Sequence, residues 1–366
     1  MLICQDQRSG IGCRHPNPNG AVQCAQCGRS LIHALRAHDS QDLIGTYRVL
    51  GIVGSGGFGV VYSAEDTRQP GTLVALKESF DPISVRSFRD EFAILHQFTH
   101  PHLPAYHDVF EAQGNGYLVM ELIEGQNLEQ ILHRRQGPLL ETQVLGYIIQ
   151  LCNALSFLHS QQPPILHRDI KPANIRLTAE GVIKLVDFGL VKLGVGTTAT
   201  SRRGATLAYA PIEQYGGIAN TDSRSDIYAL GATLYHLLTG QEPVAAPQRI
   251  AQSPDPLQNP RAINPHISAS VAEAIVKAMS IPQNSRYPTI TEFQKILLDP
   301  KSMQNSGAVT ALPTQPQCKH CGALNTPSTI YCQQCARMLR GEQRGAHCKH
   351  NLPVGALFCP TCGKPA

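Results

Sequence analysis

The chain has 366 residues, of which 42% are hydrophobic and 16% are charged, and this balance excludes a disordered polyelectrolyte. One hydrophobic core rarely organises so long a chain, so we expect two or three folded units. The net charge of only +4 excludes the strongly basic surface that is typical of a dedicated nucleic-acid binder, so we expect no nucleic-acid partner.

The N-terminus and the cysteines indicate a soluble cytoplasmic protein without membrane contact. No apolar run approaches the roughly 18 residues that a membrane helix needs, and the first residues, MLICQDQRSG, lack the pattern of a signal peptide. The 12 cysteines gather near the two ends of the chain, with only Cys152 between the clusters. In a reducing compartment, terminal clusters of this kind indicate bound metal rather than disulfides.

Composition divides the chain into segments. The cysteine-rich ends are too short to fold around an apolar core, whereas the long middle part alternates apolar runs with turn signals. The stretch that follows, KSMQNSGAVTALPTQPQ, has little apolar periodicity and is typical of a linker. We expect a cysteine-rich module at 1–30, a linker at 31–44, a large domain at 45–299, a second linker at 300–316, and cysteine-rich modules at 317–340 and 345–366.

The large domain begins with strands and continues with helices. YRVLGIVG, GVVYSAED, TLVALKES and GYLVMELIEG are strand-like, and SVRSFRDEFAILHQF has helical spacing of its apolar residues. From residue 140 on, ETQVLGYIIQLCNALSFLHS, SDIYALGATLYHLLTG, SASVAEAIVKAMS and TITEFQKILLD predict helices. This order predicts an α+β fold with a β-rich lobe followed by an α-rich lobe, and ligands commonly bind in the cleft of such a pair.

A glycine-rich turn lies between the first two predicted strands. GSGGFGVV places Gly54, Gly56 and Gly59 there, and glycines let a backbone close over phosphate groups without side-chain clash. Such turns are also common in hairpins without a ligand. VALKE then puts Lys77 inside an apolar strand, where a charge needs a partner, and Glu91 on the predicted helix is a suitable counter-ion. The alternative is a surface lysine and a surface glutamate that never meet.

The stretch HRDIKPAN, residues 167–174, crowds several polar groups into one loop between apolar runs. Asp187 follows in a DFG triplet, 18 residues after Asp169. The order of glycine loop, strand lysine, helix glutamate, HRDIKPAN and DFG resembles the eukaryotic-type protein kinase family. The resemblance covers about residues 45–299 and implies the bilobal protein kinase fold, with a β-rich N-lobe and an α-rich C-lobe. We expect the cysteine-rich ends to form small zinc-ribbon units that flank this fold.

The resemblance implies a catalytic role for each polar group of these motifs. Phosphoryl transfer depends on positioning and charge neutralisation more than on covalent chemistry. Asp169 would accept the proton of an attacking hydroxyl, and Lys171, which is typical of Ser/Thr kinases, would neutralise charge on the transferred group. Lys77, held by Glu91, would grip the α- and β-phosphates of ATP. The expected substrates are Ser and Thr residues of proteins, including the chain itself.

The resemblance also implies a Mg²⁺-ATP site. Mg²⁺ prefers oxygen ligands and bridges substrate phosphates, and Asn174 and Asp187 carry such oxygens. Met120 stands at the gatekeeper position before the hinge ELIEG. The expected nucleotide-binding residues are Gly54, Gly56, Gly59, Val61, Ala75, Lys77, Met120, Glu121, Asn174 and Asp187.

Further residues match landmarks of the same family. Asp226 in SRSDIYALG corresponds to the helix aspartate that steadies the catalytic loop, and Arg286 to the late arginine that pairs with Glu213 at the end of the activation segment. Arg168 is typical of kinases that depend on a phosphate in that segment. The candidate phosphorylation sites are Thr197, Thr198, Thr200 and Ser201, and the alternative is a plain flexible loop.

Three positions depart from the family pattern. Ala205-Thr206 replaces a Gly-Thr pair, APIE has one residue more than Ala-Pro-Glu, and Arg176 stands where most kinases place an apolar residue beneath the adenine. The longer motif ATLAYAPIEQYG is similar to that of bacterial, especially cyanobacterial-type, kinases. Because no phosphate- or metal-binding group is lost, we expect an active kinase. The alternative is a pseudokinase scaffold that recruits partners through its cysteine-rich ends.

The C-terminal cysteines have the spacing of a zinc ribbon. CKHCG and YCQQC give two CxxC pairs with ten residues between them, and four thiolates so spaced suit a tetrahedral Zn²⁺. This segment resembles the small zinc-ribbon family, which we expect here to contact protein, with redox or metal sensing as the alternative. The predicted ligands are Cys318, Cys321, Cys332 and Cys335.

An internal repeat predicts two further zinc sites. CRHPNPNGAVQCAQCG and CKHNLPVGALFCPTCG both have ten residues between the first cysteine and the CxxC pair. Each lacks a leading CxxC partner, so Cys4 or His15 would complete the first site and His350 or His347 the last. The alternative is a degenerate ribbon that has lost its metal. The predicted ligands are Cys4, Cys13, Cys24 and Cys27 in the first site, and Cys348, His350, Cys359 and Cys362 in the last.

Overall fold

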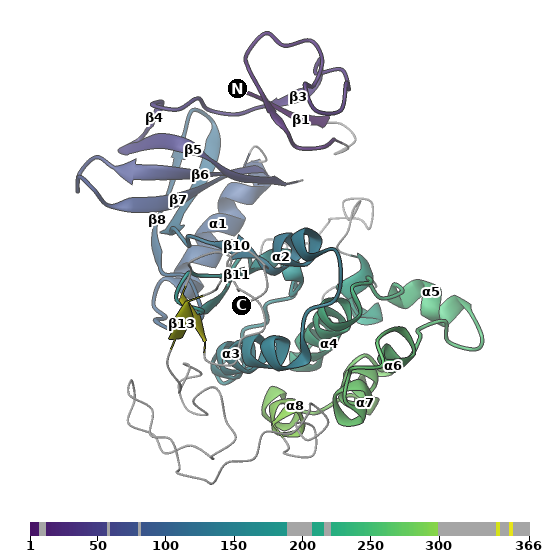
Figure 1. Cartoon of the computed structure of the whole chain (residues 1–366). Helices are drawn as coiled ribbons and strands as arrows, with labels where there is room; N and C mark the ends of the chain where they lie inside the picture. The colour runs from purple at the N-terminus through teal and green to yellow at the C-terminus, as the bar shows by residue number, and fades with distance from the viewer. Residues whose placement is uncertain are drawn as a thin grey trace. The chain divides into compact units, whose positions relative to one another are not determined.

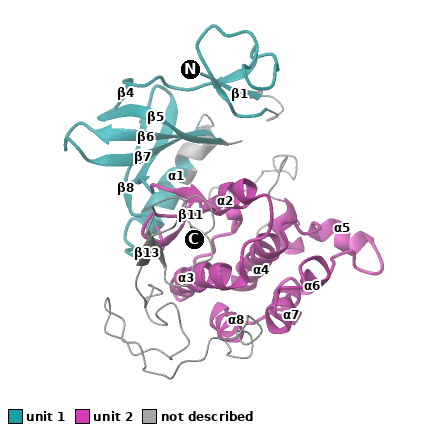
Figure 2. Cartoon of the chain, viewed as in Figure 1, with its two compact units in different colours: residues 1–100, 104–123, 191–203 teal, residues 101–103, 124–190, 204–366 magenta. Residues whose placement is uncertain are grey.

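The computed structural model describes residues 1–6, 12–56, 59–79, 82–188, 207–215, 221–298, 342–344 and 351–353 (Figure 1). In this part the chain forms two compact units, one of residues 1–100 with 104–123 and one of residues 101–103 with those from 124 on (Figure 2). The candidate phosphorylation sites and all predicted zinc ligands from Cys318 to Cys362 lie outside the described residues.

The first unit is built on a six-stranded antiparallel sheet with the strand order β4-β5-β6-β7-β9-β8. Buried and partly buried residues alternate strictly along β6, because successive side chains of a strand point to opposite faces. In β7 most residues are buried on both faces, so this strand lies at the centre of the unit. The strands are β4 (Leu43–Ile44), β5 (Tyr47–Gly56), β6 (Gly59–Asp66), β7 (Leu73–Ser79), β8 (Tyr106–Ala112) and β9 (Asn115–Glu121).

Both faces of this sheet are covered. Helix α1 (Pro82–Leu95) packs on β7, β8 and β9 and buries Phe88 and Leu95 there. A small N-terminal sheet, with the order β2-β1-β3, supplies Ile3 and Leu35 to the core on the opposite face. Its strands are β1 (Leu2–Asp6), β2 (Pro16–Asn17) and β3 (Ala34–Arg36).

Residues 31–44 differ from the linker that their composition predicts. They contain β3 and β4, and Leu31, Leu35 and Ile44 are buried. The physical reason is that these apolar side chains complete two cores, one around the N-terminal cysteines and one over the large sheet. Runs of two or three strand residues are too short to leave a periodic pattern in the sequence.

The second unit is mainly helical, as the sequence predicts. A short antiparallel sheet of β10 (Gln126–Asn127), β11 (Ile175–Leu177) and β12 (Ile183–Leu185) accompanies the helices. Strands β13 (Glu342–Arg344) and β14 (Asn351–Pro353) pair with each other. The helices are α2 (Leu128–Arg135), α3 (Glu141–His159), α4 (Ser223–Thr239), α5 (Ala246–Ala251), α6 (Pro260–Ile263), α7 (Ala269–Ala278) and α8 (Ile290–Leu297).

Helix α4 is the centre of the second unit. Every residue from Ser225 to Thr239 is buried, because α3, α6, α7 and α8 pack around it. The helix begins where the Asp222 side chain accepts the N–H of Arg224, and it ends at Gly240, whose φ of 73° suits glycine. Among the described helices, none has the length and the hydropathy that crossing a bilayer requires.

Candidate active site and metal centre

The HRDIKPAN loop is fixed by one buried carboxylate of α4. Asp226 accepts the backbone N–H of His167 at 2.9 Å and that of Arg168 at 2.8 Å. Its Oδ2 also lies 2.9 Å from Nε2 of His159, at the end of α3. Burial alone would raise the pKa of Asp226, but these hydrogen bonds and the charge of His159 more than offset it, so the pKa lies below its ordinary value. A charged Asp226 therefore holds the loop backbone in place.

Two side chains of this loop converge on Asp169. Lys171 Nζ lies 3.1 Å from Asp169 Oδ2. Asn174 Nδ2 donates to the backbone oxygen of Asp169 at 2.8 Å and to its Oδ2 at 3.0 Å. The short 3₁₀ helix η1 (Pro172–Asn174) turns the chain so that the amide can reach back. Because Nδ2 is engaged by Asp169, the carbonyl oxygen of Asn174 is left as the atom that can bind a metal.

The strand that leads to DFG is joined to the same loop. The N–H of Val186 donates to the backbone oxygen of Asn174 at 2.9 Å, and His167 Nε2 lies 3.2 Å from Val186 O. Burial lowers the pKa of His167, so its ring is neutral at neutral pH and Nε2–H is the donor. The ring also packs on Phe188, with centroids 4.6 Å apart. Asp187, which lies between Val186 and Phe188, adopts a φ of 60°, a strained conformation of a kind that clusters at functional sites.

The donor set of this loop fits magnesium. Asn174 and Asp187 offer a carbonyl and a carboxylate oxygen from two segments that the Val186 hydrogen bond ties together. Hard oxygen donors of this kind, few in number, are what Mg²⁺ takes from a protein when phosphate oxygens complete its shell. The residues present therefore fit the metal that the motif implies.

The first unit gathers the predicted nucleotide residues on one face of its sheet. Val61 pairs with Lys77 and Ala75 pairs with Met120, and directly paired residues share a face. Ala75 and Lys77 are two residues apart on β7, so all four side chains lie on the same face. Glu121 follows at the end of β9, where its carboxylate accepts the N–H of Ala105 at 3.0 Å.

Lys77 lies on the side of the sheet that α1 covers. Its Nζ is 5.8 Å from the centroid of the Phe88 ring. Glu91 is one helical turn after Phe88, is buried, and accepts a hydrogen bond from Tyr106 OH at 3.2 Å. The structure thus places the strand lysine beside the part of the helix that carries the predicted counter-ion.

The glycines of the first hairpin have distinct surroundings. Gly54 pairs with Val61, and a Cβ at Gly54 would meet no atom within 4 Å, so this position leaves open space. Gly59 pairs with Gly56, has a φ of 154°, and lies so close to the backbone of Glu78 that any side chain would collide. The hairpin therefore needs glycine at Gly59 for packing and has room over Gly54 for a ligand.

The end of the activation segment is anchored by a buried ion pair. Arg286 Nη1 donates to Glu213 Oε1 at 2.6 Å and its Nη2 donates to Oε2 at 3.0 Å. Ser225 at the start of α4 donates to the same carboxylate at 2.8 Å. The extra residue in the APIE motif therefore leaves Glu213 able to make the predicted pair. Arg176, another departure, donates from Nη2 to the backbone oxygen of Gly125 at 2.8 Å.

One contact of the loop has no signal in the sequence. His159 ends α3 and, taken from the sequence, is a plain helix end, yet it binds Asp226. A lone histidine carries no pattern that predicts its partner 67 residues away.

The N-terminal cysteines converge on a single point. The Sγ atoms of Cys4, Cys13, Cys24 and Cys27 all lie within 4.8 Å of one another. Cys4 and Cys27 are 3.6 Å apart, and Cys13 and Cys24 are 3.5 Å apart. A tetrahedral zinc with Zn–S bonds of about 2.3 Å would separate its sulfurs by about 3.8 Å, so the four thiols fit this ion. Of the two predicted fourth ligands, the structure places Cys4 in the cluster.

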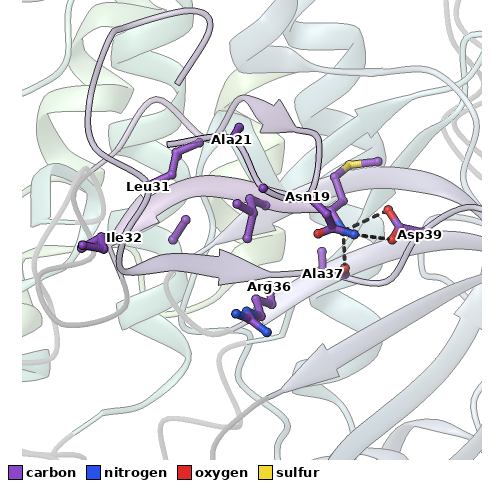
Figure 3. Close-up of a pocket in the computed structure, with 11 residues that line it drawn as sticks. Asn19, Ala21, Leu31, Ile32, Arg36, Ala37 and Asp39 are labelled. Carbon is purple, nitrogen blue, oxygen red and sulfur yellow. Dashed lines mark hydrogen bonds and ion pairs between the residues drawn. The ribbon is translucent and has the colours of Figure 1, made fainter. Parts of the chain in front are cut away.

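A pocket of about 540 Å³ lies in the same N-terminal region (Figure 3). Leu31, Ile32 and Arg36 contribute to its lining, and at one side Asn19 Nδ2 donates to Asp39 at 2.8 Å. None of the residues predicted as catalytic, nucleotide-binding or metal-binding lines this pocket.

A strand lysine beside a helix glutamate, and a loop of Asp169, Lys171 and Asn174 fixed by a buried aspartate, define a protein kinase. The chain matches the protein kinase domain model over residues 47–308 and the double zinc ribbon model over residues 318–365. It therefore belongs to the protein kinase family and carries a C-terminal double zinc ribbon. The resemblances that the sequence predicts are confirmed.

Individual relatives agree with this assignment. The chain is 30% identical to serine/threonine-protein kinase B of Synechocystis over 87% of its own length and 55% of the relative's. It is 31% identical to a probable serine/threonine-protein kinase PknB of Lactococcus lactis over 71% of its length and 43% of the relative's. The chain thus spans about half the length of these curated relatives.

Solved structures agree on the fold. The match to a double mutant of the kinase domain of Mycobacterium tuberculosis PknI covers 73% of this chain and 100% of that chain, with a TM-score of 0.59 and 26% identity. The apo form of PpkA-294 covers 71% of this chain and 99% of its own, with a TM-score of 0.62 and 24% identity. The predicted α+β kinase fold is confirmed.

Proposed function

We propose that the chain is an active Ser/Thr protein kinase, which transfers the γ-phosphate of Mg²⁺-ATP to Ser or Thr hydroxyls of proteins. The observation that carries this proposal is the convergence of Lys171 and Asn174 on Asp169, in a loop whose backbone Asp226 holds. A scaffold without catalysis has no need for this arrangement. The kinase domain implies ATP and protein substrates.

Each group of the second unit has a task in the proposed reaction. Asp169 accepts the hydrogen bond, and then the proton, of the attacking hydroxyl. Lys171, held 3.1 Å from Asp169 Oδ2, supplies positive charge near the transferred group. Asn174 and Asp187 are the proposed metal ligands. When bound, Mg²⁺-ATP supplies the phosphoryl group, and its metal offsets the charge of the phosphates.

The first unit supplies the proposed nucleotide-binding surface. Lys77 would bind the α- and β-phosphates, and the space over Gly54 leaves room for the backbone to approach them. Val61, Ala75 and Met120 lie on the same face and offer apolar surface to the adenine ring. Autophosphorylation of the activation segment is part of the proposal, since Arg168 precedes the catalytic aspartate.

We further propose that the N-terminal cysteines bind one Zn²⁺ and that the C-terminal ribbons bind two more and contact protein. The convergence of four thiols supports the first site. The double zinc ribbon match supports the others. Thiols that gather without cross-linking suit a reducing compartment, and we place the protein in the cytoplasm.

Transfer of labelled phosphate tests the proposed activity. Full-length protein would be incubated with Mg²⁺, labelled ATP and casein, and the products hydrolysed to identify phosphoserine and phosphothreonine. We expect both the chain and casein to be labelled, and labelling to need Mg²⁺. Asp169→Ala, purified in parallel, is the matched control. Equal labelling by wild type and Asp169→Ala would favour the scaffold over the kinase.

A further inference from the structure

The outer face of the kinase sheet is buried in this chain, and the N-terminal residues bury it. Tyr62 and Tyr117 are 0% exposed and Glu78 is 1% exposed, although all three lie on the face opposite to Lys77 and α1. The residues that cover them belong to one core with Ile3 and Leu35 of the N-terminal strands. The N-terminal strands therefore form one continuous core with the outer face of the sheet.

Strand β1 lies between two cores and contributes side chains to both. Neighbouring residues of a strand point to opposite faces. Ile3 packs into the core over the kinase sheet, whereas Cys4, the next residue, packs with Cys24 and Leu31 around the thiol cluster. Pairing of β1 with β3 places Ile3 opposite Leu35, so both strands carry the contact. Because Ile3 and Cys4 are adjacent on β1, an interaction that fixes Cys4 in the cluster also fixes Ile3 against the sheet.

The segment after β3 reaches the strand that carries the predicted catalytic lysine. His38 Nε2 lies 3.3 Å from Glu78 Oε1 and 3.2 Å from Tyr117 OH. Glu78, next to Lys77 on β7, also accepts from Tyr62 OH at 2.6 Å and from Tyr117 OH at 2.6 Å. A buried carboxylate needs polar neighbours to replace its lost hydration, so removal of the His38 ring, which lies within ion-pair distance of Glu78, loosens this site.

We propose that metal binding by Cys4, Cys13, Cys24 and Cys27 positions β7 and its Lys77, with β1 and the His38–Glu78 contact as the connection. The N-terminal module is then a working part of the kinase N-lobe, and His38 is a positioning residue for the nucleotide site. The effect on ATP rests on the proposed kinase function. The effect on the strands does not, and it can be measured without catalysis.

Hydrogen exchange of the full-length chain tests the connection. We expect Cys27→Ser to lower the zinc content by one ion per chain. Cys27 is an exposed proposed ligand that belongs to neither of the two cores. We also expect the substitution to raise amide exchange in residues 47–79 at least tenfold. Val22→Thr, a change at a position that is 76% exposed in the same module, should leave this exchange unchanged. Loss of the zinc with unchanged exchange in residues 47–79 would overturn the proposal.

A second pair of variants keeps the metal ligands intact. In His38→Ala the zinc content should stay at the wild-type value while exchange in β7 increases and the KM for ATP rises about three- to tenfold with little change in kcat. His38→Gln, whose amide can donate to Glu78, should restore much of the slow exchange in β7 and much of the wild-type KM for ATP. Wild-type exchange and ATP affinity in His38→Ala would contradict the proposal. If the wild type transfers no phosphate, binding of a fluorescent ATP analogue replaces KM, which separates failure of this inference from failure of the kinase activity.

Discussion

Asp226 accepts the backbone N–H of Arg168 at 2.8 Å while its own side chain is 0% exposed. One buried carboxylate thus connects the central helix of the second unit to the loop that carries Asp169. Arg168 itself has a φ of 63°, which a non-glycine residue adopts only when its surroundings hold it there. The geometry of the loop therefore depends on the position of α4 in the helical core.

Removal of this carboxylate should disable the loop. Asp226→Ala leaves the backbone N–H groups of His167 and Arg168 buried without an acceptor, at a cost of about 1–3 kcal/mol for each group. We expect the free energy of unfolding to fall by about 3 kcal/mol or more and phosphoryl transfer to fall at least 100-fold. Urea unfolding and the transfer assay measure the two effects. Retention of wild-type transfer by a folded Asp226→Ala would show that the loop needs no such anchor.

The ion pair of Arg286 and Glu213 predicts a large loss of stability. The Arg286 side chain is 0% exposed and that of Glu213 is 9% exposed, so removal of the arginine leaves a carboxylate that is nearly buried. Breaking one side of a buried pair costs about 3–5 kcal/mol. We expect Arg286→Ala to lower the free energy of unfolding by about 3 kcal/mol, as measured by urea denaturation.

The matched control is Arg286→Lys, which keeps the charge but cannot reproduce the two parallel hydrogen bonds. Its free energy of unfolding should lie between those of Arg286→Ala and the wild type. Equal stability of wild type and Arg286→Ala would mean that the end of the activation segment is held by other contacts.

Buried His236 predicts a loss of stability in mild acid. Burial lowers its pKa to about 4, and the neutral ring lies 2.6 Å from Tyr209 OH through Nδ1. The unfolded chain binds a proton at its ordinary pKa of about 6.5, whereas the folded chain does not until about pH 4. The contribution of neutral His236 to the free energy of unfolding is therefore fully present above pH 6.5 and is lost as the pH falls toward 4. Melting temperatures at pH 7.5 and 5.0 measure it.

The comparison variant for this effect is His236→Gln, which keeps a hydrogen-bond partner for Tyr209 but does not titrate. Its melting temperature should fall less between pH 7.5 and 5.0 than that of the wild type. An identical fall in both proteins would assign the acid sensitivity to other groups.

Zinc content tests the three proposed sites. We expect up to three zinc ions per chain in freshly purified, reduced protein, measured by elemental analysis. Chelation should release them and unfold the C-terminal ribbons, because apparent binding energies of about 10–16 kcal/mol are folding energies in units of this size. The helical unit has its own apolar core around α4 and should keep its circular dichroism. Absence of zinc, or cysteines paired as disulfides, would refute these sites.

The sequence predicts which polar groups gather in this loop because phosphoryl transfer, the proposed chemistry, demands fixed residue types at fixed spacing. Asp169, Lys171 and Asn174 stand within one short loop, and the structure brings them together as the spacing implies. The long-range supports could not be predicted. His159 and His38 reach their partners across 67 and 40 residues, and a single histidine leaves no periodic signal. The covering of the outer sheet face likewise depends on tertiary packing.

The most direct test of the kinase assignment compares Asp169→Asn with the wild type under saturating Mg²⁺-ATP. The substitution keeps the size of the side chain and removes its ability to take a proton. We expect kcat for casein phosphorylation to fall roughly 10²–10⁴-fold, the usual contribution of a general base, while the dissociation constant for ATP changes less than threefold. Turnover by Asp169→Asn within threefold of the wild type would contradict the assignment of Asp169 as the catalytic base.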